Sequence, residues 1–356
     1  MKPKTGKPSI KDVATLAGVS LGSVSRVINK FENVGPEVRE RVQRAMRELD
    51  YRLDHAAQTL RSRSSHTVGC MFTDVSNPLY AKLYRIFEAK LRHAGYMVLL
   101  ANSLNDPQWE LEILSMFQSR RMDGVIIAPG NERNPAVLEA VEKLGIPAVI
   151  LDRDMDVQQD QLLFDHPRGM KDAVMHLANL GHRDIALVVA DTQTRPMRRR
   201  IEGFKAGLKA KGLKARPEHI VRLPSSVSPA FDAVTRILEG PARPTAVVTL
   251  GTIVLADVLN AISAQGLRIP RDISLITMGD PEFARSHRPS ISSVTVDLEF
   301  AAETGVRMLL ERMRDQPQSP LRRTVVPTQF VLRESCGPAP APAGASARRG
   351  PKSRGG

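Results

Sequence analysis

The chain has 356 residues, which predicts two or three domains of roughly 100–200 residues each. It carries 51 Lys+Arg, 38 Asp+Glu and 42% hydrophobic residues, a globular composition with a net charge of +13 that excludes wholesale disorder. Two cysteines, Cys70 and Cys336, exclude a disulfide framework, and no apolar run suits a signal peptide or a membrane span, so we expect a cytoplasmic protein without a membrane partner.

The excess positive charge lies at the two ends of the sequence. Residues 1–65 carry +6 and residues 337–356 carry +4, whereas the 271 residues between them carry only +3. This asymmetry favours a polyanionic partner, nucleic acid before a membrane surface, over a merely solvated basic surface.

Residues 9–50 are predicted to form three short helices. Ser9 and Asp12 have the spacing of a capping box, and Gly18 supplies the left-handed residue that ends a first helix. Ser20 can cap a second helix, and Pro36 suits the first position of a third. Because the turn 18–20 between the first two helices is so short, the segment matches a helix-turn-helix motif.

After residue 66 the pattern changes to alternating strands and helices. We expect strands at 68–72, 97–101, 125–128, 148–151, 185–189, 246–250 and 273–278, with helices that include 78–93, 135–144, 168–180, 199–211 and 253–265. This alternation predicts parallel sheets with helices on both faces, and the size suits two lobes with a ligand cleft at the carboxyl ends of the strands. The polar residues 52–66 are predicted to form a linker with room for a short helix, and the Pro/Ala/Gly/Arg segment 337–356 to be a disordered basic tail.

The most informative segment is SIKDVATLAGVSLGSVSRVIN, residues 9–29. With VSNPLY (75–80), AGYMVLLANS (94–103), RRMDGVIIAP (120–129), GIPAVILDRD (145–154), LGHRDIA (180–186) and RRRIEGF (198–204), it resembles the lactose/galactose-repressor (LacI/GalR) family of bacterial transcription regulators over residues 9 to about 333. The resemblance implies a small all-α helix-turn-helix headpiece (1–51), a hinge (52–66) and an α/β core of two doubly wound lobes like those of periplasmic binding proteins (67–336). The lobes would be interleaved, with crossovers near 165, 295 and 326.

The resemblance implies a DNA-binding surface on the second helix. In a helix-turn-helix this helix enters the major groove, and the positions expected to face the bases are Leu21, Gly22, Ser23, Ser25 and Arg26. Among them, only Arg26 can grip guanine bidentately. Phosphate contacts are expected from Ser9, Ser20 and Asn29.

A leucine of the hinge, Leu60, is expected to wedge into the minor groove, as in the family, rather than to pack on the core surface. Leu53 and Asp54 stand where the family has Pro-Asn, which weakens the expectation of tight hinge binding.

The resemblance also implies an effector site between the lobes. The expected contacts are Thr73, Asp74, Tyr80, Asp152 and Arg200, and a pair formed by Asp152 and Arg200 would suit a polyol. The chain reads Gly-Thr at 251–252 and Thr-Met-Gly-Asp at 277–280, so the family's sugar-binding aspartate is missing and Asp280 comes one place late. A sugar acid or a sugar phosphate therefore becomes a candidate beside a neutral sugar.

The predicted function is that of a dimeric repressor of a near-palindromic operator, in which the effector rotates one lobe against the other. The alternatives are a solute-binding protein without a DNA role, a corepressor-dependent regulator of non-sugar metabolism, and an enzyme that uses the cleft. Residues 18–22 match G-x-S-x-G, but they follow a helix and not the strand that a nucleophile elbow needs. The sequence predicts no catalytic residue, no metal ligand set and no nucleotide cofactor.

Overall fold

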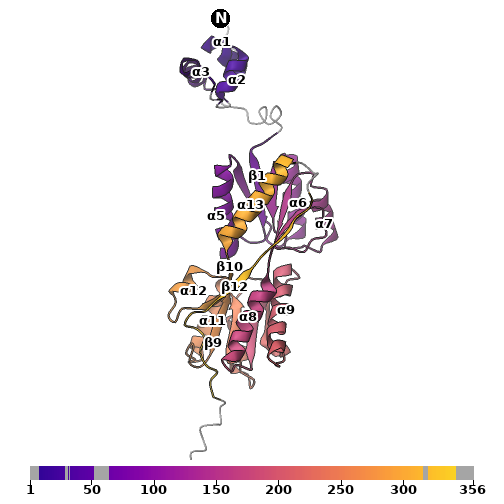
Figure 1. Ribbon diagram of the computed structural model, residues 1–356, viewed down its shortest axis with the longest axis vertical. Coiled ribbons are helices and arrows are strands. Elements are labelled where there is room, and N and C mark those ends of the chain that lie inside the picture. The colour runs from indigo at the N-terminus through magenta and orange to yellow at the C-terminus, as the bar shows by residue number, and fades with distance from the viewer. Residues whose placement is uncertain (1–7, 29–30, 32, 52–63, 316–319, 342–356) are drawn as a thin grey trace, which may run out of the picture. The chain divides into compact units, whose positions relative to one another are not determined.

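The computed structural model describes residues 8–28, 31, 33–51, 64–315 and 320–341. The chain forms two compact units, residues 1–65 and residues 66–356 (Figure 1). The first unit contains the helices α1 (Ile10–Ala17), α2 (Leu21–Ile28) and α3 (Pro36–Glu48). A small apolar core built on Val13, Val24, Val27 and Val42 holds these helices together.

The ends of the headpiece helices follow from local side-chain chemistry. The capping box of α1 is present, because the Ser9 N–H donates to the Asp12 carboxylate at 2.8 Å and the Asp12 N–H donates to Ser9 Oγ at 3.4 Å. Ser20 Oγ accepts from the Ser23 N–H at 3.1 Å at the start of α2. The capping predictions for α1 and α2 are therefore confirmed.

The turn between α1 and α2 is fixed from the third helix. Gly18 has a φ of +61°, and Arg41 of α3 donates to the carbonyls of Ala17 and Gly18 at 2.6–3.0 Å. These bonds satisfy carbonyl groups that the end of α1 leaves without helical partners. The turn is thus held by both its glycine and a tertiary arginine.

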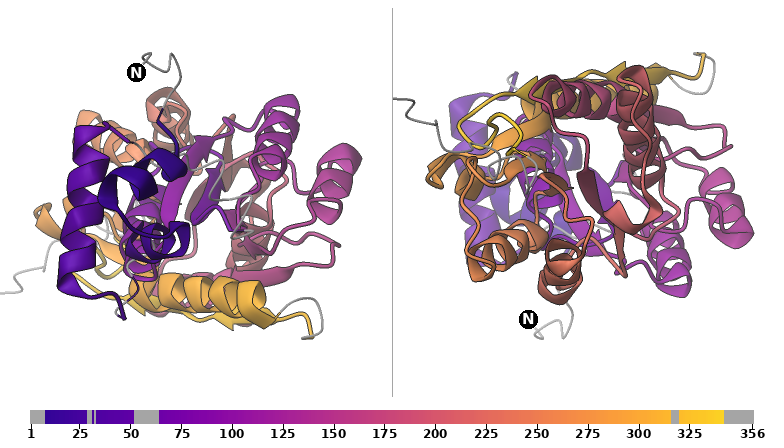
Figure 2. Two further views of the ribbon diagram at one scale, coloured as in Figure 1. Left: turned by 90° about the horizontal axis from the view of Figure 1, so that it is seen from above. Right: turned by 90° about the horizontal axis from the view of Figure 1, so that it is seen from below.

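The second unit contains two parallel α/β lobes (Figures 1 and 2). The sheet of the N-terminal lobe has the order β11-β5-β4-β3-β1-β2. Its strands are β1 (Thr67–Phe72), β2 (Met97–Asn102), β3 (Gly124–Ile127), β4 (Ala148–Leu151), β5 (Asp160–Phe164) and β11 (Arg323–Val326). Helices α5 (Pro78–His93) and α13 (Leu298–Asp315) contribute to one apolar cluster on this sheet, and α6 (Pro107–Ser119) and α7 (Pro135–Glu142) contribute to another.

The C-terminal lobe repeats this plan with the sheet order β12-β10-β9-β8-β6-β7. Its strands are β6 (Ile185–Ala190), β7 (Ile220–Leu223), β8 (Ala246–Leu250), β9 (Ser274–Met278), β10 (Ser292–Val296) and the antiparallel β12 (Thr328–Val331). Its helices are α8 (His166–Asn179), α9 (Arg195–Ala210), η1 (Pro217–His219), α10 (Phe231–Glu239), α11 (Ile253–Ala264) and α12 (Glu282–Ser286). Helix α8 packs on α9, and α10 packs on α11.

The chain passes from one lobe to the other at Asp165, Asp297 and Pro327, because β5, β10 and β11 are each followed by an element of the opposite lobe. The carboxyl ends of the parallel strands in both sheets carry the loops that line one cleft. The predicted fold class, a helix-turn-helix headpiece with a two-lobed α/β core, is confirmed. Within the described ranges, no helix has both the length and the apolar character needed to cross a bilayer.

The segment expected to be a disordered tail begins with ordered residues. The Gly337 N–H donates to Ser274 Oγ at 3.0 Å, and the Ala339 N–H donates to the Leu180 carbonyl at 2.8 Å. His182, expected to be a structural turn residue, is buried against Thr245, Ser274 and the Gly337 carbonyl. The expectation was wrong for residues 337–339, whose backbone groups find partners on the C-terminal lobe, and residues 342–356 lie outside the described part.

Candidate functional site

The outer face of α2 presents the residues expected to meet DNA bases. Leu21, Gly22 and Arg26 are exposed, and Ser23 and Ser25 are partly exposed, whereas Val24 and Val27 point into the headpiece core. The Arg26 guanidinium forms no hydrogen bond or ion pair with any described residue. The surface therefore offers one uncommitted cation among small or apolar side chains, which suits insertion into a major groove.

The residues expected to contact phosphate are only partly described. Ser9 and Ser20 are exposed at the starts of α1 and α2, where their hydroxyls also cap the helices. Asn29 and the expected minor-groove wedge, Leu60, lie outside the described residues.

The cleft between the two lobes has a volume of about 1180 Å³. Five residues expected to contact an effector line it, namely Thr73, Tyr80, Asp152, Arg200 and Asp280. Asp74 does not line the cavity, and its carboxylate instead accepts from the Ser76 N–H at 2.9 Å in the loop after β1. The structure thus brings together all but one of the predicted effector contacts.

Asp152 is the centre of a buried polar cluster at the end of β4. Its carboxylate lies 2.7 Å from His166 Nε2, accepts from the Arg195 guanidinium at 2.8 Å and accepts from the Phe164 N–H at 3.2 Å. The backbone at Asp152 has a φ of +52°, a strained conformation for a non-glycine residue that these bonds help to hold.

The charges around Asp152 decide its ionisation. Burial disfavours the charged carboxylate, but the hydrogen bond from His166 and the positive charges of Arg195 and Arg153 outweigh that effect and hold the pKa of Asp152 well below its usual range. Burial lowers the pKa of His166, so we assign a neutral ring that donates its Nε2 proton to Asp152. Asp152 is therefore ionised, and its carboxylate is already paired with Arg195 and His166 of the protein itself.

The expected pairing of Asp152 with Arg200 was wrong. Arg195 occupies that place, because the first turn of α9 brings it against both Asp152 and the Phe164 carbonyl, each at 2.8 Å. Arg153, next to Asp152, is also committed, since it donates to the carbonyls of Ala128 and Pro129 and to the Tyr80 hydroxyl.

Arg200 is left facing the cleft without an acidic partner. Its Nη1 lies 4.0 Å from the Met197 sulfur, and no described carboxylate forms an ion pair with it. Burial lowers the pKa of the guanidinium, but an arginine remains charged at neutral pH. The cleft therefore contains a partly buried cation that forms no ion pair with a described acid, although the charge of Asp152 acts on it from a greater distance.

Asp280 is differently placed. Its carboxylate pairs with Arg285 at 2.6 Å and with Arg333 at 2.9 Å. Two guanidinium groups therefore compete with any hydroxyl of a ligand for this acid.

Several cleft residues were not foreseen from the sequence. The cavity is also lined by the polar side chains of Asn77, His166, Thr192, Thr194, Ser226 and Thr252. Most follow the ends of strands, a position that could have marked them, but Ser226 and Thr252 meet only in the fold, where Thr252 Oγ1 donates to the Ser226 carbonyl at 2.6 Å.

A helix-turn-helix unit joined to a two-lobed core with a polar interlobe cleft defines a ligand-controlled DNA-binding regulator. Residues 9–54 match the bacterial regulatory proteins of the lacI family, and residues 174–336 match a periplasmic binding protein-like domain. The chain is 30% identical to the ribose operon repressor of Escherichia coli over 310 residues, which are 86% of this chain and 93% of the relative. It is 31% identical to the HTH-type transcriptional repressor PurR of Erwinia tasmaniensis over 327 residues, which are 91% of this chain and 96% of the relative.

Solved structures agree with this assignment. The lac repressor dimer bound to operator and the anti-inducer ONPF superposes with a TM-score of 0.79 at 25% identity, covering 93% of this chain and 99% of that one. A LacI family transcriptional regulator from Enterococcus faecium with bound ribose gives a TM-score of 0.67 at 26% identity, covering 76% of this chain and 99% of that one. The chain belongs to the lacI family of bacterial regulatory proteins, a family of transcription regulators, and is a DNA-binding regulator under allosteric control by a small molecule.

Proposed function

We propose that the protein is a cytoplasmic, homodimeric repressor of a near-palindromic operator, without enzymatic activity, and that its effector is an anionic sugar derivative. The uncommitted guanidinium of Arg200 in the cleft carries the choice of effector. A carboxylate or phosphate on a sugar would give this cation the partner that the protein does not supply, in a bidentate contact.

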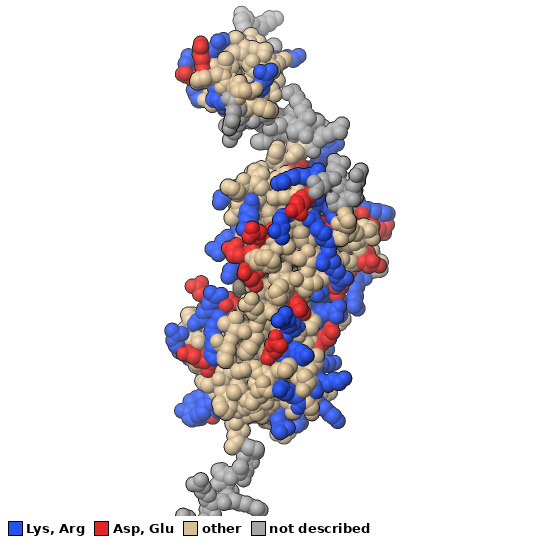
Figure 3. All heavy atoms as spheres, viewed as in Figure 1, with Lys and Arg blue, Asp and Glu red and all other residues tan. Residues whose placement is uncertain are grey.

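The headpiece supports the DNA-binding part of the proposal. Its exposed face of α2 contains Arg26, and residues 1–65 carry a net charge of +6. On the face of the core in Figure 3, acidic and basic side chains are interspersed, as expected for a surface that does not follow a polyanion. A two-fold dimer presents two such helices, and the lac repressor dimer bound to operator is a precedent in the family.

Ribose, ribonate and ribose 5-phosphate test the effector class, because they share a carbon skeleton and differ in charge. Isothermal titration of the full chain should detect binding of ribonate or ribose 5-phosphate. The protein should bind ribose at least ~10-fold more weakly, since a hydrogen bond to a charged group contributes about 1.5–3 kcal/mol. Equal affinity for the three compounds would contradict the anionic assignment. A change in operator binding on addition of the bound compound would identify it as an effector.

A further inference from the structure

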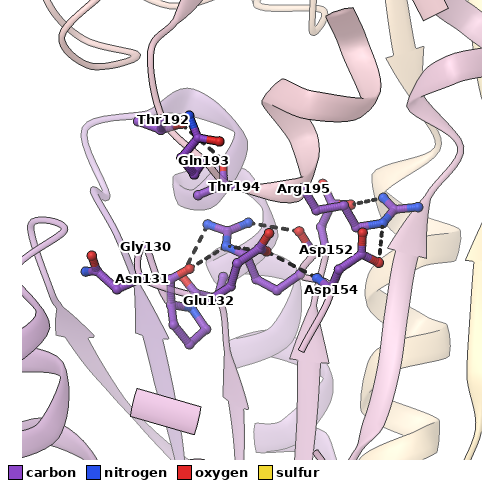
Figure 4. A network of polar contacts seen from close by, with 12 residues as sticks. Gly130, Asn131, Glu132, Asp152, Asp154, Thr192, Gln193, Thr194 and Arg195 are labelled. Carbon is purple, nitrogen blue, oxygen red and sulfur yellow. Dashed lines mark hydrogen bonds and ion pairs between the residues drawn. The ribbon is translucent and has the colours of Figure 1, made fainter. Parts of the chain in front are cut away.

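Acidic side chains of the N-terminal lobe meet arginines of the C-terminal lobe beside the cleft. Glu132, in the loop after β3, pairs with Arg198 of α9 at 2.6 Å. Asp154, after β4, pairs with Arg195 at 3.3 Å, with Arg198 at 3.4 Å and with Arg199 at 3.8 Å. Figure 4 shows the loop 130–132 and the residues after β4 facing the start of α9.

These contacts are shielded from water on the side of Glu132. The Glu132 side chain is 1% exposed, and its carboxylate also accepts from the Asp154 N–H at 3.1 Å. Burial raises the pKa of Glu132, and the charges of Arg153 and Arg198 offset this only in part. Removing one member of such a buried pair leaves an uncompensated charge, so a substitution at Glu132 or Arg198 alone should disfavour the lobe arrangement in which they meet.

The start of α9 would be unfavourable without these acids. Arg195, Arg198, Arg199 and Arg200 all lie in its first two turns, and the first acid of the helix is Glu202. Cations near a helix N-terminus are repelled by the helix dipole, and acids there are favoured. Glu132 and Asp154 supply that negative charge from the other lobe.

We propose that Glu132 and Asp154 form a latch with Arg195 and Arg198, which holds α9 against the N-terminal lobe, positions Arg200 in the cleft and sets the balance between lobe arrangements. Arg200 follows the latch arginines on the same helix, so the latch can affect effector binding through Arg200. This role in effector control rests on the proposed function. None of Glu132, Asp154, Arg195 and Arg198 lines the cavity, so they act as positioning residues and not as effector contacts. Any rotation of the lobes that separates β3 and β4 from α9 must break the latch.

The distance between the lobes tests the latch without any effector. Spin labels would be placed at the exposed Glu112 of α6 and Arg236 of α10 in the full chain, with Cys336→Ala to remove the partly buried thiol. With labelled chain diluted in an excess of unlabelled chain, so that distances between subunits do not contribute, we expect one main distance in this background. Glu132→Gln and Arg198→Gln should each shift the ratio of the main distance to a second one by about 2- to 30-fold, the range seen for substitutions that alter coupling between sites. The double variant should shift it little further, because both changes break the same pair.

Arg222→Gln is the matched control, since Arg222 pairs with Asp191 at 2.9 Å within the C-terminal lobe. It should leave the distance unchanged. Distances unchanged in both latch variants, or additive shifts in the double variant, would overturn the proposal. If Glu132→Gln fails to fold, Asp154→Asn replaces it, since that carboxylate is 23% exposed. Equal affinity for the three ribose compounds would contradict the proposed effector class and leave this result intact.

Discussion

Helices α2 and α9 each begin at a functional surface, but their arginines differ in whether acidic side chains pair with them. In α2 the Arg26 guanidinium is exposed and uncommitted. In α9 the preceding arginines are paired with acids of the other lobe, and only Arg200 faces the cleft without one. The location of an uncommitted cation thus indicates its ligand: an exposed one suits a polyanion whose binding weakens with salt, and an enclosed one suits a small anion.

The largest expected effect, a loss of stability, comes from breaking the buried contacts of Asp152 with Arg195 and His166. Asp152→Asn keeps the shape of the side chain but leaves the buried Arg195 with less compensation, so the free energy of unfolding should fall by about 3 kcal/mol. Urea unfolding of the full chain measures this change. Asp191→Asn removes a surface acid that is 54% exposed and should change stability by less than ~1 kcal/mol.

Asp152→Asn should also change the pH dependence of the free energy of unfolding. The folded pKa of Asp152 lies below its unfolded value of about 3.9, so its contribution is fully present above that pH and is lost as the pH falls through the folded pKa. The free energy of unfolding measured between about pH 5 and pH 2 should therefore fall less steeply with pH in Asp152→Asn than in the wild type, and an unchanged slope would contradict the low pKa.

The uncommitted arginine of α9 gives the next effect. Arg200→Gln should weaken binding of an anionic ribose derivative by about 1.5–3 kcal/mol, because a hydrogen bond to a charged group is lost, and should leave operator binding without effector intact. Titration of ribonate and ribose 5-phosphate measures the change. A variant that binds and responds like the wild type would remove Arg200 from the effector site.

Local sequence predicts the helix ends of the headpiece but not all the strands of the core. The limits of α1, α2 and α3 follow from Ser9, Gly18, Ser20 and Pro36, which act within a few residues. Strands β5 and β11 were not predicted because each is short; β5 pairs with both β4 and β11, and β11 pairs with residues about 160 positions away. Burial in the sheet explains β5, whereas β11 is mostly exposed and is a strand because it pairs with β5.

The wrong partner for Asp152 has the same origin. Arg195 lies 43 residues from Asp152, and no spacing rule connects them. One physical signal was present, since arginines at the start of a helix require acids from elsewhere. The effector contacts remain predictions that the geometry of the cleft supports.

Arg26→Ala tests the exposed cation of α2. Loss of a bidentate contact to guanine should reduce discrimination between operator and altered operator by about 1–3 kcal/mol, while the headpiece remains folded. Fluorescence anisotropy with both duplexes at several salt concentrations measures this, and the variant should also show a smaller salt slope if Arg26 contacts phosphate. Unchanged selectivity would exclude Arg26 from base recognition.

The smallest effect is expected at the turn that sets the angle of α2. Gly18→Ala places a Cβ in a left-handed conformation and 2.7 Å from Arg41 Nη2, so the headpiece should lose about 1–2 kcal/mol of stability and operator affinity should fall with it. Gly35→Ser is the control, since Gly35 has a φ of −56° and open space around it, and serine is a good residue at this N-cap of α3. If both variants have the same melting temperature, the geometry of the turn does not determine the stability of the headpiece. The position of Arg26 would then depend on the apolar core alone.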